Sequence, residues 1–125
     1  MTAQEEPGTE QGPVRRFTDS GYQPQASTLG ALRQRIDTLD AQIVALLAQR
    51  ALCVKDATRF KRDHFQVSAP ARQAQVFEKV RALAVRHASG FDGLPDIVEA
   101  TYRTLVAGYI AGEAGFFEQT ELITP

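Results

Sequence analysis

The chain has 125 residues, of which 43% are hydrophobic, so it can bury the core of one domain. Fourteen basic and fifteen acidic side chains give a net charge of −1, which argues against nucleic acid as the main partner because phosphate binding needs a basic surface. One cysteine, Cys53, rules out an internal disulfide, and His64 and His87 are too far apart in sequence for a local metal motif, so we expect no metal site.

The N-terminal segment 1–27 differs in composition from the rest of the chain. It is rich in Pro, Gln, Glu, Gly, Ser and Thr and lacks apolar periodicity, which predicts a disordered tail. It also lacks the apolar stretch of a secretory signal, and nowhere does an apolar run approach the ~20 residues of a membrane span. We therefore expect a cytoplasmic protein with no membrane partner, in which residues 28–119 form one helical domain and residues 120–125 a C-terminal tail.

A very long helix is predicted from about residue 29 to residue 62, with Ser27 or Thr28 as its N-cap. Its apolar residues recur at steps of three and four, the spacing of one helix face: Leu32, Ile36, Leu39, Ile43 and Leu46. Such a helix is roughly 50 Å long, which exceeds the expected diameter of a domain of this size. Its apolar stripe needs cover from outside the chain, and homodimerisation is the simplest source.

Two further helices complete an all-α chain. The segment 64–69 interrupts the pattern, and Pro70, which suits a first helical turn, begins a short helix that runs to about His87. A medium helix follows from Pro95 to about Glu118. Because no strand pattern is present, the predicted fold is all-α, with a very long, a short and a medium helix and a homodimer formed along the first.

Charged residues interrupt the apolar faces of these helices. Arg50 and Lys61 fall in the apolar arc of the first helix, with Arg33 at its edge, while Arg72 lies near the arc of the second helix and Glu113 in that of the third. Burying charge is costly, so either an internal salt-bridge network or a ligand must compensate it. Four cations face one acid, and this excess favours an anionic small molecule with more than one carboxylate, which the planar fork of arginine binds well.

The same residues carry a resemblance to a known family. The pieces are Leu32-Arg33-Gln34-Arg35-Ile36-Asp37, Asp40, Arg50 and Lys61, Ala69-Pro70-Ala71-Arg72, and Tyr109-Ile110-Ala111-Gly112-Glu113. In this order and at these spacings, the chain from Leu29 to about Phe117 resembles the all-helical AroQ-type chorismate mutases and the isochorismate pyruvate lyases that share their fold.

The resemblance implies an intertwined homodimer in which Arg33 is donated across subunits to each of two equivalent sites. Lys61, Glu113 and Arg50 would be catalytic, with Lys61 and Glu113 meeting the ether oxygen of the substrate. The substrate-binding residues would be Arg33, Arg50, Arg72, Gln73 and Tyr109. The reaction implied is the pericyclic rearrangement of chorismate to prephenate, a step of aromatic amino acid biosynthesis in the shikimate pathway that needs neither a cofactor nor a metal.

Three functions stay open on the sequence. Chorismate mutase is expected first, as the commoner activity of the fold. Isochorismate pyruvate lyase, which forms salicylate and pyruvate, is the first alternative. It is favoured by Ala69 and Gln73, which stand where well-studied bacterial mutases carry acids, and by Tyr109, which resembles the lyases. Glu113 favours the mutase, since lyases carry glutamine at this position. The second alternative is a non-catalytic helical dimer, an interaction module whose buried charges set register and partner choice.

Overall fold

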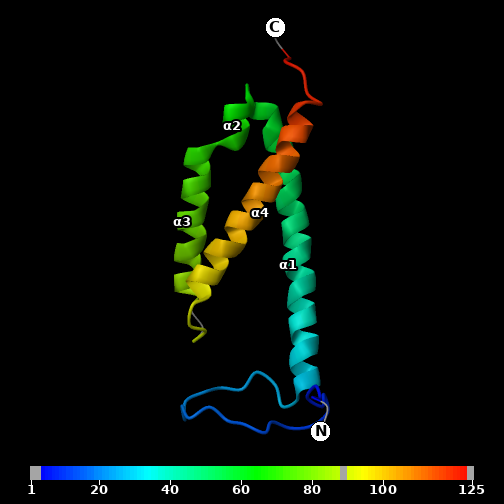
Figure 1. Cartoon of the computed structure of the whole chain (residues 1–125), viewed down its shortest axis with the longest axis vertical. Helices are drawn as coiled ribbons and strands as arrows, with labels where there is room; N and C mark the ends of the chain where they lie inside the picture. Colours follow the sequence, from blue (N-terminus) through cyan, green and yellow to red (C-terminus); the bar gives the residue numbers. More distant parts are fainter. Residues whose placement is uncertain (1–3, 88–89, 124–125) are drawn as a thin grey trace. The chain divides into compact units, whose positions relative to one another are not determined.

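The computed structural model of the chain describes residues 4–87 and 90–123 (Figure 1). Its elements in chain order are α1 (Leu29–Ala57), a 3-10 helix η1 (Thr58–Phe60), α2 (His64–Ser68), α3 (Pro70–Arg86) and α4 (Leu94–Phe117). No described residue is in a strand, which confirms the predicted all-α class. The second and third predicted helices are confirmed as α3 and α4, with ends within one residue of those expected.

The chain divides into two compact units, Met1–Ala48 and Gln49–Pro125, and the boundary falls inside α1. In the first unit the described residues before α1 form turns and bends without regular structure. Thr28 caps α1, since its hydroxyl accepts a hydrogen bond from the Ala31 N–H at 3.1 Å. The disorder of segment 1–27 stays a prediction, and its first three residues lie outside the described part of the chain, as do the last two of the predicted C-terminal tail.

The apolar face of α1 is largely exposed. None of the residues of α1 is buried, and the side chains predicted to form its apolar stripe, Ile36, Leu39 and Ile43, are 54%, 48% and 51% exposed. Because exposed apolar surface is costly in water, this face is suited to contact another protein surface. Among the described residues, no helix combines the length and the apolarity needed to cross a membrane.

In the second unit α4 packs against α3 and α2, and Figure 1 shows α3 and α4 side by side. The buried apolar side chains come from all three helices: Val67, Val76, Ala84 and Val106. Full burial of a valine side chain contributes about 1.5–3 kcal/mol, so this small core holds the second unit together. An ion pair between Arg81 and Asp96 also joins α3 to α4, with 2.7 Å between Nη2 and Oδ1.

The predicted end of the first helix at residue 62 is wrong, and the segment 64–69, which was predicted to interrupt the helical pattern, contains the short helix α2. After Ala57 the backbone tightens into η1, and Lys61 is extended, with φ −103° and ψ 136°. Asp63 then begins a new helix, because its carboxylate accepts a hydrogen bond from the Gln66 N–H at 2.9 Å. An aspartate in this capping position stabilises a new helix start, and this competes with continuation of α1.

Candidate active site

A cavity of about 310 Å³ opens in the second unit between the end of α1 and helices α2, α3 and α4. It brings together six of the seven predicted site residues, namely Arg50, Lys61, Arg72, Gln73, Tyr109 and Glu113. The small side chains Val54 and Ala57 of α1 also line it. The seventh predicted residue, Arg33, lies on the part of α1 that belongs to the first unit, where it is exposed.

Glu113, on α4, is the most buried charged group of this cavity, at 4% exposure. Its Oε2 has no hydrogen-bond partner among the described residues and lies 3.6 Å from the Nζ of Lys61. A buried carboxylate is costly unless it is paired, so Lys61 acts as its counter-ion. A buried oxygen without a hydrogen bond is unusual in a folded protein, and here a ligand could satisfy it.

Lys61 reaches the cavity from a short connector between η1 and α2. The prediction that it shares a helix face with Arg50 is wrong, because α1 ends at Ala57. Its backbone N–H instead donates to the Thr58 carbonyl at 3.1 Å, and its Nζ donates to the carbonyl of Gln66 at 3.0 Å. The side chain, 21% exposed, therefore lies between a backbone carbonyl on α2 and the carboxylate of Glu113.

Arg50, half-buried on α1, is held by two aromatic rings of α4. Its guanidinium carbon lies 5.7 Å from the centre of the Tyr102 ring and 5.3 Å from that of Tyr109. Cation–π contacts use the face of the guanidinium and leave its N–H donors at the edge for other partners. In the described part of the chain, no carboxylate lies within 4.0 Å of this group, so those donors are not committed to an ion pair.

The charges of the cavity do not balance. Lys61 pairs with Glu113, the one acid among the described lining residues, while Arg50 and Arg72 have no acidic partner there. The internal network of Arg50, Lys61 and Glu113 that the sequence left open is therefore reduced to a single pair. Arg72 is also more exposed than its apolar-arc position suggested. Two guanidinium groups thus remain for an anionic ligand with two carboxylates.

Gln73, at the start of α3, contributes an amide to the same cavity. Its Nε2 donates to the carbonyl of Ser68 at 2.6 Å, which fixes the amide against the end of α2. The side-chain oxygen of an amide accepts hydrogen bonds at any pH and carries no charge. The α3 wall of the cavity therefore offers a neutral acceptor where a carboxylate would add an anion.

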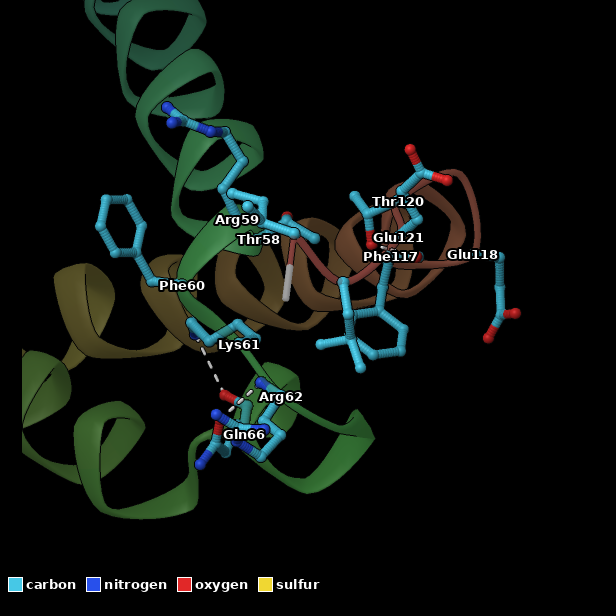
Figure 2. A pocket seen from close by; sticks show the side chains of 12 residues that line it. Thr58, Arg59, Phe60, Lys61, Arg62, Gln66, Phe117, Glu118, Thr120 and Glu121 are labelled. Atoms are coloured by element: carbon cyan, nitrogen blue, oxygen red, sulfur yellow. Dashed lines mark hydrogen bonds between the residues drawn. The ribbon is translucent and has the colours of Figure 1, made fainter. Parts of the chain in front are cut away.

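A second cavity, of about 720 Å³, shares Lys61 with the first and is lined by residues 58–62, Gln66 and residues 117, 118 and 120–123 (Figure 2). Its charged lining residues are Arg59, Lys61, Arg62, Glu118 and Glu121. Cations and acids are nearly balanced here, and Glu118 is already paired with His64, 2.6 Å away. This cavity therefore has no comparable excess of charge for an anion, although it is the larger of the two.

Two residues that contact the site residues were not among those predicted. Tyr102 contacts Arg50, and its spacing of seven from Tyr109 places both rings on one side of α4. Gln66 was not considered, although Asp63 followed three residues later by glutamine is a typical helix-start signal.

Comparisons with known proteins agree with this geometry. Residues 32–114 match the family model described as chorismate mutase type II. The isochorismate pyruvate lyase of Pseudomonas aeruginosa is 32% identical over 92 residues, which cover 74% of this chain and 87% of that protein. The matched family region contains Arg33 and every residue that lines the smaller cavity.

Proposed function

We propose that this chain, which belongs to the chorismate mutase type II family, is an enzyme that rearranges chorismate to prephenate. The observation that supports this most directly is the charge of the smaller cavity, where two arginines that have no acidic partner among the described residues accompany a buried lysine–glutamate pair. Chorismate carries two carboxylates, which match the two arginines, and an enolpyruvyl ether, whose oxygen matches the lysine–glutamate pair. The product would feed aromatic amino acid biosynthesis.

The proposed reaction requires no covalent bond between the substrate and the protein. The ether C–O bond breaks while a new C–C bond forms in the same molecule, so no proton, electron or group is exchanged with the enzyme. Catalysis then comes from holding the folded conformer and from stabilising negative charge on the ether oxygen as its bond lengthens. In this proposal Arg50 and Arg33 bind the carboxylates, Lys61 and Glu113 contact the ether oxygen, and Arg72, Gln73 and Tyr109 complete the binding surface.

The proposal includes a homodimer in which Arg33 reaches the site of the second copy. Its support is the exposed apolar stripe of α1, which includes Ile36, Leu39 and Ile43, each about half exposed. Arg33 lies on the same helix, so an α1-mediated dimer would carry this cation toward another subunit.

Isochorismate pyruvate lyase is the second candidate, favoured by the name of the Pseudomonas relative and by the neutral Gln73 on the α3 wall. In that reaction the ether C–O bond breaks and a ring hydrogen passes to the enolpyruvyl methylene. Isochorismate thereby gives salicylate and pyruvate without any co-reactant. The same arginines and the same Lys61 would bind this isomer, whose hydroxyl is placed differently on the ring.

A paired assay on the purified protein decides between the two. One sample receives chorismate and the other isochorismate, and the products are separated and identified. We expect prephenate from chorismate at an efficient rate. Salicylate and pyruvate from isochorismate with poor mutase turnover would instead assign the lyase, and silence on both substrates would overturn the enzymatic proposal.

Glu113 gives a prediction about substitution in the cavity. A glutamine amide can donate a hydrogen bond to the ether oxygen, whereas an alanine side chain offers no polar group. We therefore expect Glu113→Gln to retain kcat/KM with chorismate and Glu113→Ala to lower it about tenfold or more.

The matched control is Glu99→Gln, on the same helix but paired with Arg103 at 3.1 Å outside the cavity. This variant should retain the natural kcat/KM. A natural kcat/KM in Glu113→Ala would remove Glu113 from contact with the ether oxygen.

A further inference from the structure

Lys61 lies outside any helix, so no helix fixes the direction of its side chain. It follows η1, precedes the cap of α2, and has an extended backbone. A lysine side chain is flexible, and a residue in a connector can shift with the connector. Something outside Lys61 must hold its ammonium group near Glu113, 3.6 Å away, if the two are to act together.

Gln66 makes three hydrogen bonds that close this connector on itself. Its N–H donates to the carboxylate of Asp63 at 2.9 Å, and its Oε1 accepts from the backbone N–H of Arg62 at 2.6 Å. Its carbonyl accepts from the Nζ of Lys61 at 3.0 Å, and Figure 2 shows Lys61, Arg62 and Gln66 grouped in this way. One residue of α2 therefore fixes both the side chain of Lys61 and the backbone that follows it.

The carbonyl of Gln66 is available for a specific reason. In a continuous helix it would accept from the N–H four residues later, but that residue is Pro70, which has no N–H. Helix α2 ends at Ser68, and the next residue, Ala69, has a positive φ of 45°, so the helical ladder stops here. The ammonium of Lys61 takes the place of the missing donor, and its remaining N–H groups can face Glu113 and a ligand.

We propose that Gln66 is a positioning residue that holds the ammonium group of Lys61 against Glu113. The proposal rests on the proposed function for its kinetic consequence only. The amide of Gln66 anchors the connector through the Arg62 N–H, and this anchor keeps the Gln66 carbonyl where Lys61 can reach it. Without the amide, the connector loosens and the ammonium leaves its place in the cavity.

The kinetic test compares Gln66→Ala with Gln66→Glu. A carboxylate oxygen can accept the same hydrogen bond from the Arg62 N–H, whereas alanine cannot. With chorismate as substrate, we expect Gln66→Ala to lower kcat about tenfold or more, with a smaller change in KM, because a misplaced catalytic group slows the chemical step. Gln66→Glu should restore most of kcat. Arg62→Ala retains the backbone N–H and should behave as the natural chain.

A second readout does not depend on activity. Amine acylation followed by mass spectrometry measures the reactivity of each lysine, with the exposed Lys55 and Lys79 as internal references. We expect Lys61 to react several-fold more slowly than Lys79 in the natural chain. In Gln66→Ala this protection should be lost, and in Gln66→Glu it should be kept.

The two readouts separate the two proposals. If the natural chain converts neither substrate, the proposed function fails, while loss of Lys61 protection in Gln66→Ala would still establish the positioning role. If Lys61 reacts at the same rate in the natural chain and in Gln66→Ala, the positioning role is overturned, whatever the enzyme does. Equal kcat in these two proteins would overturn it as well.

Discussion

Replacing Lys61 by methionine should remove catalysis while the helices stay in place. Methionine fills a similar volume without charge, so the ether oxygen loses its cationic partner and the chemical step slows. Loss of one such preorganised group typically lowers kcat by about 10²–10³-fold, and we expect at least this for Lys61→Met. The rate of chorismate disappearance measures the loss, and circular dichroism confirms that the helical content is retained.

The stability of this variant needs a matched control, because Lys61→Met leaves Glu113 buried without its counter-ion. Removing one partner of a buried pair can cost about 3–5 kcal/mol. The double variant Lys61→Met with Glu113→Gln has no charge to compensate. We expect it to recover the free energy of unfolding in urea but not the activity.

The opposite pattern would support the non-catalytic dimer. If Lys61→Met were more stable than the natural chain and equally active, the lysine would be a register device in an interaction module. The enzymatic proposal requires the double variant to be as stable as the natural chain and yet inactive.

Helices α3 and α4 were predictable because local pattern and packing agree in them. Their apolar residues recur at helical spacing, a proline opens each, and side chains such as Val76 and Val106 are buried where the pattern expects. The end of α1 was not predictable in the same way. No proline or glycine interrupts residues 58–62, so the helical pattern runs on, while the structure is decided by the competing cap at Asp63.

The candidate site was predictable in composition but not in geometry. Charges that interrupt apolar faces identified Arg50, Lys61 and Glu113, and the cavity does contain them. The route by which Lys61 enters depends on Gln66 and on the missing N–H of Pro70, and neither is a feature of helical periodicity. The cation–π contact between Arg50 and Tyr102 joins α4 to α1 across segments that are far apart in sequence, which no local pattern encodes.

Mixing two inactive variants tests the proposed homodimer, in which Arg33 of one subunit completes the site of the other. Arg33→Ala and Arg50→Leu should each lose about 2–5 kcal/mol of transition-state binding, because each removes a cation from a substrate carboxylate. In the proposed dimer each site takes Arg33 from one subunit and Arg50 from the other. A mixed dimer therefore has one site with both arginines and one site with neither.

Equal amounts of the two variants, unfolded together and refolded, should form mixed dimers in about half of the molecules, which restores about one quarter of the natural number of sites. The specific activity of the mixture, compared with each variant refolded alone, measures this recovery. Mixing Arg50→Leu with Lys61→Met is the control: both residues come from the same subunit in every site, so no intact site can form. Recovery in the first mixture and none in the second requires Arg33 to act across subunits. If neither mixture recovered activity, Arg33 and Arg50 would act from the same chain, and the exposed stripe of α1 would then need another partner.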